Sequence, residues 1–237
     1  MPFTREARSV LVIVDMVVDS LTGFYPVQKA DEVIRNAVRV REACYTAGIP
    51  VVQLQHLASA DGRTAMLNEP RLADGVTPAA SVPGTPGFEI VPQLAPAGRD
   101  IVVTKHRWQG FFATELQSVL RKLGAEQLVW IGTFTDCCLS LSVFESYAHD
   151  YPSALVLDAA GCDNEFTHKT AVLTMANWIF DLNVFTTESF VRWASGDDDA
   201  PAWRAQRPNQ LAFDSGEAVE ARYSELLAAA SSPVPST

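Results

Sequence analysis

Trp130-Ile131-Gly132-Thr133-Phe134-Thr135-Asp136-Cys137-Cys138-Leu139 is the stretch that decides the fold. An apolar run ends at a glycine, and a Thr-Asp pair then opens a segment with helical periodicity. This pattern is typical of a buried strand that turns directly into a helix. Cys138 falls in the first turn of that helix, where free amide groups and the helix dipole favour a thiolate over a thiol. The stretch therefore predicts a nucleophilic cysteine.

Apolar runs alternate with helical patterns on both sides of this stretch. Strands are expected at residues 10–14, 49–54, 101–104, 127–131, 154–157 and 184–185. Helices are expected at residues 31–47, 116–123, 135–149 and 167–180. Strands that alternate with helices form a parallel sheet covered on both faces. The sequence thus predicts an α/β fold, a three-layer Rossmann-like sandwich with a six-stranded, mostly parallel sheet and helices on both faces.

Residues 1–195 are expected to form one domain, and residues 196–237 a C-terminal extension. Three aspartates at 197–199 and two prolines indicate a linker, and residues 231–237 are expected to be disordered. A short amphipathic helix is predicted by the spacing of Val219, Tyr223, Leu226, Leu227 and Ala230. Residues 57–99 form a long excursion rich in Gly, Pro, Ala and Ser, and such excursions are more often functional than idle.

The composition limits the classes of function. The 237 residues carry a net charge of -10, which argues against a nucleic-acid partner and against an anionic membrane surface. The apolar run at 10–18 is too short to cross a membrane and lacks the layout of a signal peptide. Two of the four cysteines are adjacent, which makes a poor disulfide framework, so a cytoplasmic location is expected.

Three reactive residue types fall at predicted strand ends. Asp15 follows the first strand, Lys105 the third and Cys138 the fourth. Sites in open parallel sheets lie at the carboxyl ends of the strands, so these side chains are expected at one edge. There a carboxylate can accept the thiol proton, and an ammonium group stabilises both anions. Each residue also has a structural explanation: Asp15 as a cap, Lys105 as a solvated strand end, and the cysteine as a small buried apolar group.

Further residues near this edge are candidates for a substrate pocket. Several are aromatic, which suggests an apolar or aromatic contact with the substrate. The candidates are Phe24, Tyr25, His56, Trp108, Phe112 and Thr133. The four histidines of the chain show no metal-ligand spacing, so no metal site is expected.

Four motifs, in order along residues 9–192, resemble those of the isochorismatase-like cysteine hydrolases. The first is Val-Asp-Met-x-x-Asp at 14–19. The second is Val-Val-Thr-Lys at 102–105, followed by Phe-Ala-Thr-x-Leu at 112–116. The third is Gly-x-x-Thr-Asp-x-Cys at 132–138, and residues 83–92 resemble the segment before the third strand. The chain is similar to the amidohydrolase branch, which includes N-carbamoylsarcosine amidase and the ureidoacrylate and biuret hydrolases.

This resemblance implies a catalytic triad of Asp15, Lys105 and Cys138, with Cys138 rather than Cys137 as the nucleophile. It implies a cis peptide between Thr133 and Phe134, and an oxyanion hole formed by the backbone amides of Phe134 and Cys138. It also implies a homodimer or homotetramer that acts on a small-molecule substrate. The chemistry requires no cofactor.

The implied reaction is hydrolysis of a C–N bond in a small amide, carbamoyl or ureido compound through a thioester-type acyl-enzyme. The chain departs from the family at Val17 and Val18, where Gln and Asn are usual, which leaves the shape of the pocket there open. It also lacks the Asp-x-His…His metal set of nicotinamidases, which argues against nicotinamide. The alternatives are C–O (vinyl ether) hydrolysis of the isochorismatase type, a redox protein using Cys137 and Cys138, and a non-catalytic module of the same fold.

Overall fold

The computed structural model describes residues 3–205 and 215–232, and these residues form one seven-stranded sheet with the strand order β3-β2-β1-β4-β5-β6-β7. The strands are β1 (Ser9–Val14), β2 (Val51–His56), β3 (Ile101–Lys105), β4 (Gln127–Thr133), β5 (Ser153–Gly161), β6 (Asn183–Phe185) and β7 (Trp203–Arg204). Neighbouring strands from β3 to β6 pair in parallel, and β7 is antiparallel to β6. The predicted α/β class with a mostly parallel sheet is confirmed.

The prediction of six strands is wrong by one. The additional strand, β7, lies in the segment that was expected to be a linker, and Ala205 N continues its attachment by donating a hydrogen bond to Leu182 O. Two residues are too few to show the alternation by which a strand is recognised in a sequence. The sheet therefore extends beyond the expected domain boundary.

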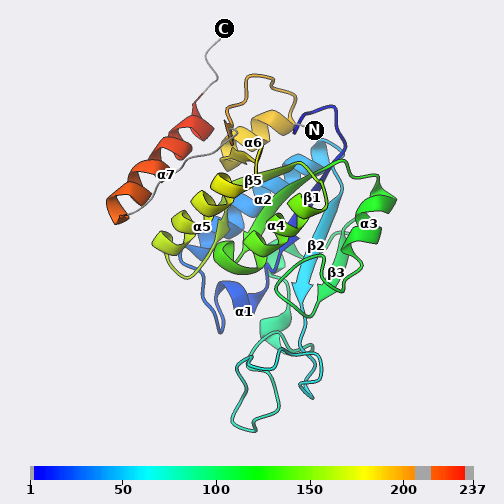
Figure 1. Cartoon of the computed structure of the whole chain (residues 1–237). Helices are drawn as coiled ribbons and strands as arrows, with labels where there is room; N and C mark the ends of the chain where they lie inside the picture. Colours follow the sequence, from blue (N-terminus) through cyan, green and yellow to red (C-terminus); the bar gives the residue numbers. More distant parts are fainter. Residues whose placement is uncertain (1–2, 206–214, 233–237) are drawn as a thin grey trace.

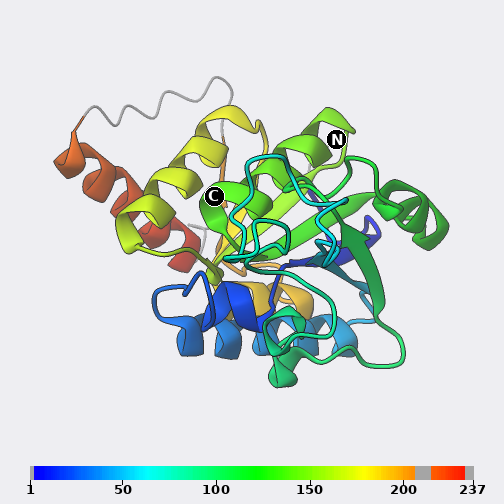
Figure 2. The ribbon, with the colours of Figure 1, turned by 90° about the horizontal axis from the view of Figure 1, so that it is seen from below.

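Helices cover both faces of the sheet (Figure 2). One face carries α2 (Ala30–Thr46) and α6 (Thr187–Ala194), and the other carries α3 (Leu116–Leu123), α4 (Ser140–Ala148) and α5 (Glu165–Trp178). Side chains of β1 alternate between the two layers: Val10, Val12 and Val14 belong to the core under α3, α4 and α5, and Leu11 and Ile13 to the core under α2. Burial on both faces explains why this strand reads as a continuous apolar run.

Four helical segments differ from the predicted ones, and one of them, α6, was not predicted at all. The segment after β4 starts with a π-helical turn, Thr135–Leu139, before α4 begins. The helix α5 begins at Glu165 rather than at residue 167, because the Asn164 side chain accepts a hydrogen bond from Thr167 N and caps it. The short helix α1 (Val18–Leu21) occupies part of a segment that was expected to be irregular.

The predicted amphipathic helix is present as α7 (Gly216–Ser231) and packs against α5 (Figure 1). Four of its predicted apolar residues are buried, whereas Leu227 is 36% exposed. Most of the segment predicted to be disordered, residues 233–237, lies outside the described residues. Within the described part of the chain, no helix combines the length and apolar character needed to span a membrane.

The part of the excursion at residues 57–99 that directly follows β2 lies beyond the carboxyl ends of β2 and β3, at the bottom of Figure 1. Its later part is tied to the loop after β1. Val91 N donates a 3.0 Å hydrogen bond to Met16 O, and Val18 N donates one of 2.9 Å to Glu89 O. The Asp19 carboxylate, 3.0 Å away, accepts a hydrogen bond from the backbone of Ser81. The first motif therefore holds the excursion beside the strand ends.

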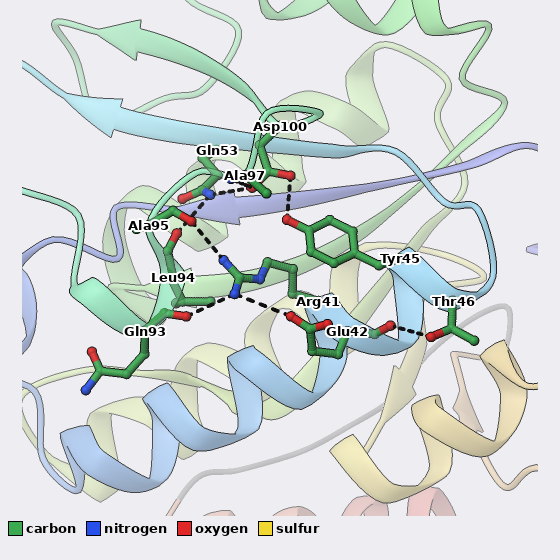
Figure 3. A network of polar contacts seen from close by, with 10 residues as sticks. All are labelled: Arg41, Glu42, Tyr45, Thr46, Gln53, Gln93, Leu94, Ala95, Ala97 and Asp100. Atoms are coloured by element: carbon green, nitrogen blue, oxygen red, sulfur yellow. Dashed lines mark hydrogen bonds and ion pairs between the residues drawn. The ribbon is translucent and has the colours of Figure 1, made fainter.

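A second attachment lies on the face covered by α2 (Figure 3). Arg41 of α2 donates hydrogen bonds to the carbonyls of Gln93, at 3.0 Å, and Ala95, at 3.2 Å. Gln53 of β2 donates to Leu94 O at 3.1 Å and to the Asp100 carboxylate at 3.0 Å. Buried polar groups that are paired in this way fix the chain without regular secondary structure.

Candidate active site

Asp15 stands at the carboxyl end of β1 and is held by both neighbouring strands. Its N–H donates to Leu54 O at 2.9 Å, and its Oδ1 accepts a 2.8 Å hydrogen bond from His56 N. Its φ of 48° is in the left-handed region, which aspartate tolerates better than most residues. Thr133, at the end of β4, donates a 2.8 Å hydrogen bond to Asp15 O. The carboxylate is therefore fixed in position and direction.

Lys105 ends β3 and forms a buried ion pair with Asp15. Its Nζ lies 2.7 Å from Asp15 Oδ2 and donates a 3.2 Å hydrogen bond to Arg107 O. Lys105 is 0% exposed and Asp15 2% exposed, so the alternative of a solvated strand end does not hold. Burial by itself would lower the pKa of Lys105, but the Asp15 carboxylate and the Cys138 sulfur outweigh it and raise that pKa. The site thus contains a charged ammonium group.

The turn that carries Cys138 begins with a close approach between β4 and β1. Gly132 has a φ of 118°, and a Cβ atom at this position would overlap the backbone of Val14. The peptide bond between Thr133 and Phe134 is cis, as the resemblance implies. Phe134 O accepts hydrogen bonds from the amides of Cys137, at 3.0 Å, and Leu139, at 3.1 Å. These bonds shape the turn between the strand and α4.

Cys138 is buried, and its sulfur and the Lys105 ammonium group interact electrostatically. The hydrogen bond with Cys137 and burial raise the pKa of Cys138 well above its usual value, and the charge of Lys105 acts in the opposite direction. The same hydrogen bond between the two sulfurs lowers the pKa of Cys137. In the resting site, burial and the neighbouring sulfur therefore outweigh the preference of a helix start for a thiolate. A thiol that keeps its proton needs a nearby base, and Asp15 lies in the same cluster.

A cavity of about 880 Å³ opens above these residues. Of the predicted site residues it is lined by Asp15, Phe24, Tyr25, His56, Trp108, Phe134 and Cys138. Lys105 lies beneath it. Thr133, which was a pocket candidate, is buried behind Asp15 and does not line the cavity. Phe112 is 56% exposed and lies outside the lining, so its assignment to the pocket is wrong. The aromatic-rich turn after β3 supplies the cavity with Trp108 instead.

The imidazole of His56 is a polar group that lines this cavity. Burial and the charge of Lys105 lower the pKa of His56. Its Nε2 is buried and has no hydrogen-bond partner among the described residues. A neutral imidazole at this position can exchange a hydrogen bond with a molecule in the cavity.

Several lining residues were not identified from the sequence. The excursion contributes residues 66–70, 80 and 81, and the loops after β4 and β5 contribute Asp136 and Asp163. Asp136 was interpreted only as a cap. Asp163 was missed because β5 ends at Gly161, four residues beyond the predicted end of that strand at residue 157. The described residues contain no group of three or more His, Cys, Asp or Glu side chains placed to hold a metal ion.

Comparison with known proteins agrees with the fold and the motifs. An isochorismatase domain model matches residues 9–189. Ureidoacrylate amidohydrolase RutB from Pseudomonas syringae pv. syringae (strain B728a) is 27% identical over 215 residues, which cover 82% of this chain and 83% of the relative.

Two solved structures share the fold. An isochorismatase family protein from Desulfovibrio vulgaris subsp. vulgaris str. Hildenborough matches with a TM-score of 0.71 and 22% identity, covering 80% of this chain and 99% of that chain. N-carbamoylsarcosine amidase from Thermoplasma acidophilum matches with a TM-score of 0.63 and 24% identity, covering 76% of this chain and 97% of that chain.

The family model covers most of the chain, so this protein belongs to the isochorismatase family. The resemblance seen in its motifs is thereby confirmed. The amidohydrolase relatives identify this protein as a hydrolase. The Asp15–Lys105 pair and Cys138 meet at the cavity at the carboxyl ends of β1, β3 and β4.

Proposed function

We propose that the protein is a cysteine-dependent amidohydrolase that cleaves a C–N bond in a small amide, carbamoyl or ureido compound. One observation carries this proposal. The ion pair between Asp15 and Lys105, 2.7 Å long and buried, lies against Cys138 at the floor of the cavity. Burial of an ion pair carries a desolvation penalty that often exceeds its contribution to stability. A base, a cation and a sulfur in one cluster suit nucleophilic catalysis.

In the first half of the reaction, Asp15 accepts the proton of the Cys138 thiol, and the sulfur attacks the substrate carbonyl carbon. The carbonyl oxygen becomes an oxyanion, to which the backbone amides of Phe134 and Cys138 donate hydrogen bonds. Such donors contribute about 3 kcal/mol each in other enzymes. The tetrahedral intermediate then breaks its C–N bond, and Asp15 gives its proton to the departing amine. The product of this half is a thioester on Cys138.

In the second half, Asp15 takes a proton from a water molecule, and the resulting hydroxide attacks the thioester carbonyl. The C–S bond breaks, Asp15 gives its proton to the sulfur, and the acid or carbamate leaves. Lys105 holds the Asp15 carboxylate in position in both halves by its direct contact. The residues of the chain thus supply every proton transfer, and no cofactor takes part in the scheme.

The named relatives support this assignment. The RutB proteins, 27% identical to this chain, are called ureidoacrylate amidohydrolases, and a structural neighbour is called N-carbamoylsarcosine amidase. A C–O hydrolysis of the isochorismatase type is the weaker candidate, because vinyl ether cleavage uses no thiol nucleophile. A redox role of Cys137 and Cys138 would leave the buried Asp15–Lys105 pair without a purpose.

The test is ammonia release from a panel of amide, carbamoyl and ureido compounds by the Cys138→Ala and Cys137→Ala variants. We expect Cys138→Ala to lose at least about a thousandfold in kcat, as triad nucleophiles do, while Cys137→Ala retains turnover. Full activity of the Cys138→Ala variant would overturn the assignment. Loss of activity in both variants, with unchanged folding by circular dichroism, would assign catalysis to the sulfur pair instead.

A further inference from the structure

We infer that the substrate is an amide that carries a bulky apolar or aromatic group and no negative charge. This inference rests on the proposed function and names the class of compound that fits the same cavity. It follows from three features of the lining: the exposed apolar side chains, the carboxylates, and the binding of the nearby cationic side chains to other groups of the protein.

Large apolar side chains are exposed to the cavity rather than packed away. Phe24 is 49% exposed, Tyr25 42%, Trp108 46% and Leu67 92%, and all four line the cavity. Phe24 and Tyr25 meet edge to face with ring centroids 4.6 Å apart, and Tyr25 meets Phe134 in the same manner at 6.3 Å. An apolar wall therefore runs from the rim down to the turn that carries Cys138. Walls of this kind are covered by a ligand of matching character.

The polar part of the lining is acidic. Glu69, Asp136 and Asp163 all line the cavity. Burial and then the charge of Asp163 raise the pKa of Asp136, so these two carboxylates repel one another. Burial and the charge of Glu69 raise the pKa of Tyr25, and both residues line the cavity. These three carboxylates surround the cavity and disfavour an anionic substrate.

The cationic side chains near the cavity are bound to other groups of the protein. Lys105 is paired with Asp15 and bonded to Arg107 O. Arg107 donates to Thr64 O at 2.9 Å, and Arg71 donates to Val76 O at 2.8 Å and Met66 O at 3.2 Å. Among the described residues, no lysine or arginine lines the cavity. A substrate carboxylate would therefore lose its water without gaining an ionic partner.

This separates the chain from the relatives named for ureidoacrylate, because acrylate is an anion. The cavity of this chain favours an amide whose remaining part is apolar and neutral or positively charged. Aromatic faces and carboxylates together also suit an ammonium group. In this cavity we expect the amide group to lie over Cys138 and the bulky group to lie between Phe24, Tyr25 and Trp108.

The experiment compares ammonia release from four amides: phenylacetamide, its 4-aminomethyl and 4-carboxy derivatives, and acetamide. We expect kcat/KM for the neutral and cationic aryl amides to exceed that of the 4-carboxy compound and of acetamide by about tenfold or more. Trp108→Ala should reduce the aryl preference, and Glu69→Gln should narrow the gap between the neutral and anionic compounds. Asp150→Asn, an exposed substitution remote from the cavity, is the matched control and should leave both ratios unchanged.

Binding to the Cys138→Ala variant, followed by calorimetry, tests the inference without turnover. Phenylacetamide should bind more tightly than its 4-carboxy derivative. Equal or tighter binding of the anion, or no binding of any aryl amide, would overturn the inference. If the anionic compound is the best substrate and its turnover requires Cys138, the substrate class is wrong and the proposed function stands. If aryl amides bind as expected but no C–N compound is hydrolysed, the proposed function fails instead.

Discussion

The imidazole Nδ1 of His168 lies 2.9 Å from the hydroxyl of Thr135, the residue that opens the turn carrying Cys138. On its other side, His168 Nε2 lies 3.2 Å from the hydroxyl of Tyr223, which belongs to α7. The helix α7 lies beyond residues 9–189, the part matched by the family model. A chain of two hydrogen bonds therefore connects the C-terminal extension to the turn of the nucleophile.

This connection predicts a pH-dependent stability. Burial lowers the pKa of His168 to about 4, so in the folded protein the ring stays neutral while the unfolded chain takes up a proton below about pH 6.5. The unfolded state then binds more protons, and the free energy of unfolding falls as the pH drops from about 6.5 towards 4. We expect a loss on the order of 2 kcal/mol for this partly shielded ring.

Urea unfolding at pH 7 and pH 4.5 measures this loss. His168→Gln should be less stable than the wild type at pH 7 but should lose less stability on acidification. Tyr223→Phe, which keeps the ring buried and removes one hydrogen bond, should cost about 1 kcal/mol at pH 7. An equal acid-induced loss in the wild type and in His168→Gln would contradict this account.

Removal of Lys105 should destabilise the protein far more than removal of a surface lysine. In Lys105→Met the buried Asp15 carboxylate loses its counter-charge, and we expect a loss of about 3–5 kcal/mol in the free energy of unfolding. Lys29, which pairs with Glu165 at 3.4 Å on the surface, is the matched control, and Lys29→Met should cost about 1 kcal/mol or less.

The double variant Asp15→Asn/Lys105→Met removes both charges. It should recover part of the stability lost in Lys105→Met while remaining inactive. Similar unfolding midpoints for Lys105→Met and Lys29→Met in a denaturant titration would show that the buried pair is not what holds this edge of the sheet.

Gly132 and Gly75 provide a test of the close approach behind the nucleophile. Both have positive φ, 118° and 70°, but only a Cβ atom at Gly132 would meet another part of the chain, the backbone of Val14. We expect Gly75→Ala to cost about 1 kcal/mol through its backbone conformation. Gly132→Ala should cost several times more and should abolish activity, because β4 must shift away from β1. Thermal unfolding of the two variants measures the difference, and equal midpoints would contradict it.

We expect Asp19 to hold the excursion at residues 57–99 in place and to take no part in the reaction itself. Its carboxylate accepts the hydrogen bond from Ser81 N and packs against Gly87. Asp19→Ala should therefore loosen residues 57–99, which limited proteolysis detects as faster cleavage there. KM should rise more than kcat falls, because the excursion lines the cavity. Asp31→Ala, at an exposed helix start, serves as the control, and cleavage at the same rate in both variants would refute this role.

The sequence predicted the sheet and one edge of the site well, since continuous apolar runs and strand-end residues are local signals. Asp15, Lys105 and Cys138 are brought together as their positions after strands indicated. The strand β7 was not predicted, because a strand of two residues forms through pairing with a strand far away in the sequence. Phe112 was misplaced for a related reason: the order of aromatic residues in a loop does not say which side chain faces a cavity. The cis peptide was implied only by the family resemblance.

The contribution of the excursion could not be read residue by residue, because its position depends on hydrogen bonds to the first motif and to Arg41 and Gln53. Its carboxylate, Glu69, is nevertheless central to the inferred substrate class. The roles of the triad and of the oxyanion hole, and assembly into a homodimer or homotetramer, stay predictions.

The most direct test of the central claim is to trap the acyl-enzyme. An aryl amide turned over by the wild type is quenched in acid, and the peptide containing residues 137 and 138 is examined by mass spectrometry. The account predicts an acyl group on Cys138 in the wild type and none in Asp15→Asn, which lacks the base. An acyl group found on Cys137, or turnover with no thioester on either sulfur under conditions that preserve a model thioester, would contradict it.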